Sequence, residues 1–149
     1  FLTMSDIEQT YETLVDEYLN ITKAYLSIDD TSMDMAIKRH PSVFAFFCSV
    51  LSYAKLVMDR ASAGLDIQEA KHTELRRSEL AAVGTKATQG ALTNYTLTVP
   101  ELIDLRDSLL EAQHKYNLSK NIVNSLDHQK DMLIQMSANK RAEVRLHEL

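Results

Sequence analysis

The segment Ser42–Leu65, SVFAFFCSVLSYAKLVMDRASAGL, is the most apolar part of the chain and decides its fold class. Its large apolar side chains recur every three or four residues, which is the spacing of one face of an α-helix. That face comprises Phe44, Phe47, Leu51, Ala54, Met58, Ala61 and Leu65. We therefore expect a middle helix over about 42–83 that supplies the core, with Gly64 as a local weak point.

A second periodic pattern precedes the middle helix and covers residues 5–28. Apolar and tyrosine side chains alternate steps of four and three there, a period of 3.5 that is typical of a coiled-coil seam. The seam comprises Ile7, Tyr11, Leu14, Tyr18, Ile21, Tyr25 and Ile28. Ser5 and Glu8 have the spacing of a capping box at the start of this helix. We interpret the tyrosines as packing residues, with a ladder on which bases stack as the alternative.

The segment between these two helices contains a break and a short helical turn. Residues 28–32, Ile-Asp-Asp-Thr-Ser, offer several capping side chains, and a helical turn to Arg39 follows them. The middle helix is expected to begin at Pro41, because the first turn of a helix does not need the N–H that proline lacks.

The second half of the chain reads as a loop over 84–97 and a long helix over about 99–145. Thr88 can cap a short helix within the loop. Thr98 and Glu101 have the spacing of a further capping box, with Pro100 in the first turn. The apolar stripe of the long helix comprises Leu102, Leu105, Leu109, Ala112, Tyr116, Ser119, Val123, Leu126, Lys130 and Leu133.

These patterns predict an all-α protein with an acidic N-terminal helix over 1–30 and a helical body over 31–149. A helix of about 40 residues is roughly 60 Å long, and a chain of 149 residues cannot cover such helices alone. We therefore expect a helical hairpin or bundle that forms a homo-oligomer, with the coiled-coil seams buried between protomers. The residues expected at that interface are Tyr11, Leu14, Tyr18, Ile21, Tyr25, Leu105, Leu109, Tyr116, Val123 and Leu126.

Composition narrows the class of protein further. Three glycines and two prolines are too few for an all-β sandwich, and the single cysteine, Cys48, cannot form an internal disulfide. The apolar run from Val43 to Ala54 contains serines and is too short to span a bilayer. The beginning of the sequence does not resemble a signal peptide, and Met4 is a candidate for the native first residue. We expect a cytoplasmic protein with no membrane partner.

Residue types that carry catalysis or hold metals show no productive pattern. None of the five histidines has another histidine four residues away, and the chain has no Cys-x-x-Cys pair. His114 and His128 would lie about 21 Å apart along one helix, too far for one metal. A glycine-rich phosphate loop is also absent. We therefore expect no catalytic residues, no metal and no cofactor.

Charge is distributed unevenly along the chain. Residues 1–37 carry a net charge of −7, whereas residues 38–149 carry +2. Nucleic acid is held by local positive charge, so the bases of the middle helix and its loop are candidate phosphate contacts. They are Lys38, Arg39, Lys55, Arg60, Lys71, Arg76, Arg77 and Lys86. An ordinary mixed-charge helix surface is the alternative interpretation.

Two segments carry a resemblance to a known family. KHTELRRSELAAVG, residues 71–84, leads into TKATQGAL, and VPELIDLRDSLLEAQHKYNLSKNIVNSLDHQKDMLIQMSANKRAE spans residues 99–143. Over about 43–145, this order of helices resembles the phage-encoded UvsY-like recombination mediators. The resemblance implies a small, oligomeric, non-enzymatic protein that binds single-stranded DNA coated by a single-strand-binding protein and helps load a RecA-type recombinase. It places DNA contacts near the end of the middle helix, at Arg76 and Arg77, with Lys71 before them.

The acidic first helix departs from this family pattern and supports a second hypothesis. It could contact a basic partner or mask the DNA site. A phage structural or assembly protein, or an inhibitor that mimics nucleic acid, would act through exposed carboxylates of this helix. These are Asp6, Glu8, Glu12, Asp16 and Glu17.

Overall fold

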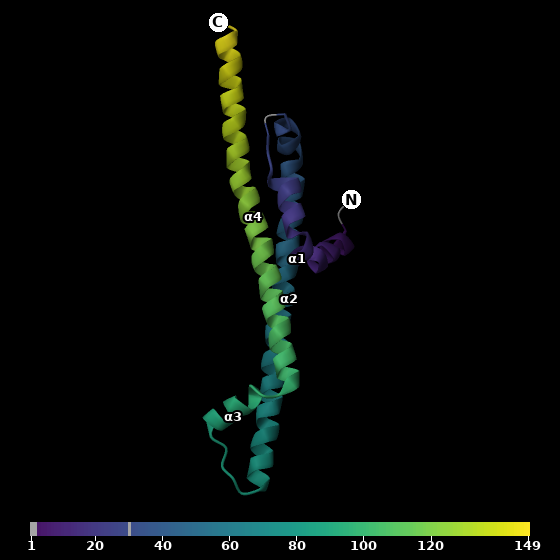
Figure 1. Ribbon diagram of the computed structural model, residues 1–149, viewed down its shortest axis with the longest axis vertical. Coiled ribbons are helices and arrows are strands. Elements are labelled where there is room, and N and C mark those ends of the chain that lie inside the picture. Colours follow the sequence, from purple (N-terminus) through teal and green to yellow (C-terminus); the bar gives the residue numbers. More distant parts are fainter. Residues whose placement is uncertain (1–2, 30) are drawn as a thin grey trace. The chain divides into compact units, whose positions relative to one another are not determined.

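The computed structural model describes residues 3–29 and 31–149. Every regular secondary-structure element in these ranges is an α-helix (Figure 1). The helices are α1 (Met4–Leu26), α2 (Met33–Ala82), α3 (Gln89–Thr96) and α4 (Pro100–His147). The expected all-α class is therefore confirmed. The chain divides into two compact units: unit 1 comprises Phe1–Ala54 with Lys115–Leu149, and unit 2 comprises Lys55–His114.

A capping box starts α1, but two residues earlier than the sequence suggested. The Thr3 hydroxyl accepts a hydrogen bond from the Asp6 amide (3.3 Å), and the Asp6 carboxylate accepts one from the Thr3 amide (2.7 Å). The expected box of Ser5 and Glu8 is therefore wrong, because Ser5 already lies inside the first turn. The bonds from Thr3 lower the pKa of Asp6 below its ordinary 3.8. The box thus contributes fully above pH 3.8, and its contribution is lost as the pH falls through the lowered pKa.

The second helix begins at Met33 and continues through Pro41. The Ser32 carbonyl accepts the amide of Ala36 (2.9 Å), which starts the helical hydrogen bonding. The expectation that a new helix begins at Pro41 is therefore wrong. Proline removes one helical hydrogen bond from the preceding turn. Helix formation upstream of it nevertheless buries Met33 and Ala36 against Leu133 of α4, and this burial favours the continuous helix.

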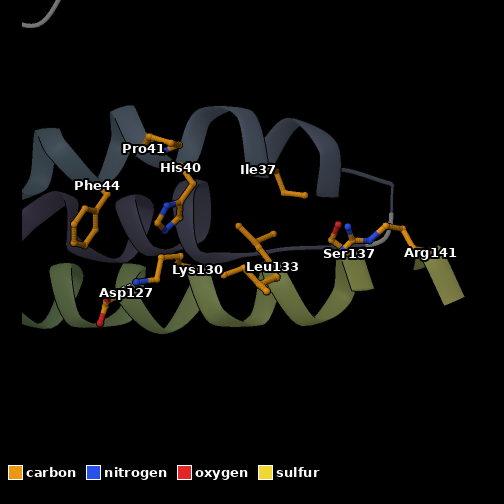
Figure 2. Close-up of a pocket in the computed structure, with 10 residues that line it drawn as sticks. Ile37, His40, Pro41, Phe44, Asp127, Lys130, Leu133, Ser137 and Arg141 are labelled. Atoms are coloured by element: carbon orange, nitrogen blue, oxygen red, sulfur yellow. Dashed lines mark hydrogen bonds and ion pairs between the residues drawn. The ribbon is translucent and has the colours of Figure 1, made fainter. Parts of the chain in front are cut away.

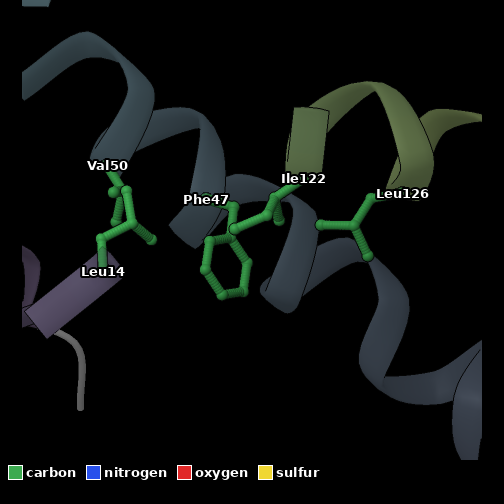
Figure 3. Close-up of a cluster of buried hydrophobic side chains, with 5 residues drawn as sticks. All are labelled: Leu14, Phe47, Val50, Ile122 and Leu126. Carbon is green, nitrogen blue, oxygen red and sulfur yellow. The ribbon is translucent and has the colours of Figure 1, made fainter. Parts of the chain in front are cut away.

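The buried core of unit 1 joins α1, α2 and α4. Five side chains form it: Leu14, Phe47, Val50, Ile122 and Leu126 (Figure 3). The ring of Phe47 packs edge-to-face on Tyr25 of α1, with 5.7 Å between ring centroids. Partly buried side chains that pack on this core include Tyr18, Ile21 and Val123.

Burial within one chain corrects part of the expected oligomer interface. Tyr11, Leu14 and Leu126 are buried by the chain itself, so placing these three between protomers is wrong. Tyr11 also packs edge-to-face on Tyr53, with ring centroids 5.2 Å apart. The seam of the first helix is thus an internal packing face. Other members of the expected interface, among them Leu105, Leu109 and Tyr116, are only partly buried.

The buried stripe of α4 keeps a seven-residue repeat, but one of its two positions lies one residue before the expected one. Ile122 and Gln129 are buried, whereas the seam residue Lys130 is exposed and pairs with Asp127 (3.2 Å). Gln129 uses its buried position to donate a hydrogen bond to the Tyr25 carbonyl of α1 (2.8 Å).

A glycine turn ends α2 in unit 2. Gly84 has a positive φ of 75°, and the Thr85 amide donates to the Leu80 carbonyl (2.9 Å), as in a Schellman motif. Thr88 then caps α3 by accepting the Ala91 amide (3.2 Å), as the sequence predicted. The buried apolar side chains of unit 2 include Leu65, Leu92, Leu102 and Ala112.

The long last helix begins at Pro100 but lacks the expected capping box. The Thr98 hydroxyl donates to the Tyr95 carbonyl (2.8 Å), and the Glu101 carboxylate contacts His72 of α2 (2.9 Å). Both side chains are therefore engaged elsewhere, and the expectation that they cap α4 together is wrong.

Within residues 3–29 and 31–149, α2 is the one helix long and apolar enough to cross a membrane by length and composition. Within α2, an 18-residue window has a mean hydropathy of 1.5 although serines interrupt it. Core helices of soluble proteins and signal sequences have the same composition. This property of α2 therefore carries little weight by itself.

The core of unit 1 makes a direct stability prediction. Leu126→Ala should lower the free energy of unfolding by about 2–5 kcal/mol, because it leaves a cavity at a fully buried site. Leu110→Ala is the matched control on the same helix, since Leu110 is 62% exposed, and it should cost less than about 0.5 kcal/mol. Urea denaturation followed by circular dichroism measures both. Equal losses in the two variants would contradict the described core.

Candidate nucleic-acid interface

The eight candidate phosphate contacts divide between the two units. Lys38 and Arg39 lie in unit 1, near the start of α2. The others belong to unit 2, where the loop before α3 holds Lys86 and α2 holds Lys55, Arg60, Lys71, Arg76 and Arg77. Unit 2 therefore carries most of the candidate interface, and each base can be assessed by the partners it has within its unit.

Arg39 has a structural role that the sequence did not indicate. Its guanidinium donates a hydrogen bond to the Ala24 carbonyl (3.1 Å) in the last turn of α1. It also lies over the ring of Tyr25, 5.7 Å from the centroid. A cation at a helix C-terminus interacts favourably with the free carbonyls there. Arg39 therefore links α2 to α1. Its neighbour Lys38 is exposed and has no ion-pair partner among the described residues.

Three of the bases in unit 2 are paired with acids one turn away. The pairs are Lys55 with Asp59 (3.1 Å), Arg76 with Glu79 (3.3 Å) and Arg77 with Glu74. Exposed pairs of this kind contribute roughly 0–1 kcal/mol each. They therefore do not lock the side chains, but each carboxylate cancels positive charge that a phosphate would otherwise meet.

Arg76 also takes part in the contacts that attach α3 to its unit. Its guanidinium lies over the Tyr95 ring, 4.9 Å from the centroid, which is a cation–π geometry. Nearby, Arg106 donates to Glu69 of α2 (2.6 Å) and to the Thr96 carbonyl (3.0 Å). No local spacing in the sequence marks Arg106 as a paired residue, because its partner on α2 lies 37 residues away.

Three bases of unit 2 remain exposed without an ion-pair partner in the part of the chain that the structure describes. They are Arg60, Lys71 and Lys86. Arg60 and Lys71 are eleven residues apart, which places them on one face of α2 about 16 Å from each other. These three side chains, called here the open cations, are the part of the predicted site best able to meet phosphates.

The opposite charge gathers on α1. Glu8, Glu12, Asp16 and Glu17 are exposed, and Asp6 is partly covered within the capping box. Glu12 approaches Lys115 of α4 at 3.7 Å, so this surface is only weakly compensated by the chain's own bases. The acidic face therefore lies in unit 1, whereas the open cations lie in unit 2.

The described residues show no arrangement suited to metal binding, since residues 3–29 and 31–149 contain no group of three His, Cys, Asp or Glu side chains placed to hold an ion. Burial raises the pKa of the Cys48 thiol, and the Asp127 carboxylate raises it further. A thiol that stays protonated is a poor nucleophile. Cys48 is best explained as a packing residue of α2.

Comparisons with known proteins give no match. Neither a protein-family model, nor a curated protein, nor a solved structure is similar to this chain.

The contacts of Arg39 predict that its side chain stabilises the folded protein, whereas that of the exposed Lys38 does not. Arg39→Ala should destabilise the protein by about 1–2 kcal/mol, because it removes a hydrogen bond from a charged donor. The adjacent Lys38→Ala removes the same charge from an exposed side chain and should change stability by less than about 0.5 kcal/mol. Thermal and urea unfolding of the two variants test this difference. A stable Arg39→Ala protein would return Arg39 to the candidate phosphate contacts.

Proposed function

We propose that this chain is a non-enzymatic phage recombination mediator. It binds single-stranded DNA in the host cytoplasm, meets DNA that a single-strand-binding protein already coats, and helps a RecA-type recombinase to load. The observation that carries the proposal is the set of open cations, Arg60, Lys71 and Lys86, within unit 2. The resemblance of residues 43–145 to UvsY-like mediators supplies the class of activity.

The open cations suit binding that does not depend on sequence. Lysine and arginine bind backbone phosphates and release condensed counterions, so the affinity for DNA falls linearly with salt on logarithmic axes. Three cations on one chain make a weak site. A homo-oligomer would repeat the open cations along the bound strand, and the repeated contacts would raise the affinity.

In this proposal, the bases that pair with acids contribute less to DNA binding than the open cations do. Arg76 and Arg77 match the position that the family resemblance gives to DNA contacts, yet each has a carboxylate within its own helix. A phosphate must compete with Glu79 or Glu74 for these guanidinium groups. We therefore expect Arg60 and Lys71 to contribute more to the salt dependence than Arg76 and Arg77.

The alternative function is an interaction protein that acts through its acidic helix. The exposure of Glu8, Asp16 and Glu17 on α1 favours it, because solvated carboxylates are available to a basic partner. A phage assembly factor or an inhibitor that imitates nucleic acid would use this surface. In that case the open cations would be an ordinary solvated face of α2.

The salt dependence of DNA binding tests the assignment of the open cations. Arg60→Ala/Lys71→Ala should weaken binding to a labelled single-stranded oligonucleotide and flatten the slope of log affinity against log salt by about 1.4, because each lost phosphate contact removes about 0.7. Fluorescence anisotropy over a salt series measures the slope.

A charge-matched control makes this test specific. Lys23→Ala/Lys120→Ala removes two exposed bases from unit 1 and should leave the slope near its original value. If both double variants lose affinity equally, the effect comes from net charge and the site assignment fails. An unchanged slope in Arg60→Ala/Lys71→Ala has the same consequence.

A further inference from the structure

Unit 1 contains a groove that the DNA-binding proposal does not use. It has a volume of about 470 Å³ and lies between α2 and α4 (Figure 2). Its apolar lining includes Ile37 and Phe44 of α2 with Leu133 and Ile134 of α4. Arg141 lies toward one end of it, as Figure 2 shows. An apolar groove with a basic end suits an amphipathic helix that carries acids next to its apolar side chains on one face.

Arg141 lines the basic end of this groove, and Arg145 follows it by four residues on α4. Arg141 and Arg145 are exposed and have no ion-pair partner among residues 3–29 and 31–149. They follow Ile134 by seven and eleven residues, so all three share one face of α4. Residues 138–149 are exposed throughout, which leaves this face open to a partner.

A helix with the complementary pattern is present on the same chain. The outer face of α1 carries Val15 and Leu19, which are 45% and 71% exposed. Glu8 and Glu12 lie on the preceding turns of this face and are exposed as well. Glu12 keeps its 3.7 Å contact with Lys115, which leaves most of its carboxylate in solvent. We name Glu8, Glu12, Val15 and Leu19 the acidic ridge.

The spacing of the acidic ridge matches that of the groove face when the two helices run antiparallel. From Leu19 back to Glu12 is seven residues, and Glu8 is four further. From Ile134 forward to Arg141 is also seven residues, and Arg145 is four further. Both intervals correspond to about 10 Å and 6 Å of helix. The apolar pair and both ion pairs can therefore form together.

We infer that the groove receives the acidic ridge of a second copy of this chain. Leu19 of one copy packs on Ile134 of the next, while Glu12 and Glu8 pair with Arg141 and Arg145. The contact joins two different surfaces, so association is head-to-tail and leaves a free groove at one end and a free ridge at the other. It deepens the homo-oligomer part of the proposed function and does not depend on DNA.

Mixing two defective variants tests this contact. Ile134→Glu blocks the groove and Leu19→Glu blocks the ridge, and both positions are exposed, so folding should be retained. Each variant alone should be monomeric by size-exclusion chromatography with light scattering. An equimolar mixture should give a 1:1 heterodimer, because one intact groove then meets one intact ridge. The wild-type chain should form larger species.

A control and a charge swap make the result decisive. Met132→Glu places the same charge on an exposed position of α4 outside the groove lining and should associate like the wild type. Arg141→Glu should weaken association at least about tenfold. Mixing it with Glu12→Arg should restore the larger species, because the groove of each variant then meets a ridge of opposite charge on the other. A monomeric wild type, or mixtures that never form heterodimers although circular dichroism shows folded variants, would overturn the inference. Because no DNA is present, either result leaves the DNA-binding test independent.

Discussion

The packing of α1 against α2 and α4 is the interaction on which the structure of unit 1 depends. Leu14, Phe47 and Leu126 meet in one buried cluster, and burying a side chain of this size contributes about 1.5–3 kcal/mol. Three side chains at the edge of the cluster form hydrogen bonds with backbone carbonyls of another helix, which makes the packing directional. They are Arg39, His40 and Gln129. With the inner face of α1 fixed in this way, its carboxylates must face solvent.

Helical periodicity predicted most of the elements, and the reason is physical. A repeat of three and four residues marks one apolar face, and such a face is buried whatever covers it. The sequence therefore located the helices, the break that begins at Gly84 and the cap at Thr88. It did not show that the face of α1 is covered by the same chain. The continuous helix through Pro41 was also missed, since the gain from burying Met33 lies outside local rules.

The candidate site shows the same division between local and distant contacts. Glu74 and Glu79 stand three residues from Arg77 and Arg76, a spacing that already marks ion pairs in the sequence. The same spacing separates Lys71 from Glu74, so the sequence alone does not show that Lys71 is left unpaired. The role of Arg39 could not be read in this way, because its acceptor lies 15 residues away on another helix. The contacts of Arg106 are similarly distant.

Unit 1 and unit 2 thus offer surfaces of different character. The open cations of unit 2 suit a phosphate backbone, and the acidic ridge and groove of unit 1 suit association between copies. The most direct measurement is the anisotropy of a labelled single-stranded oligonucleotide with the wild-type chain at about 50 and 200 mM salt. We expect binding that weakens steeply at the higher salt. Absence of binding at both concentrations would contradict the mediator function and leave the acidic helix as the functional surface.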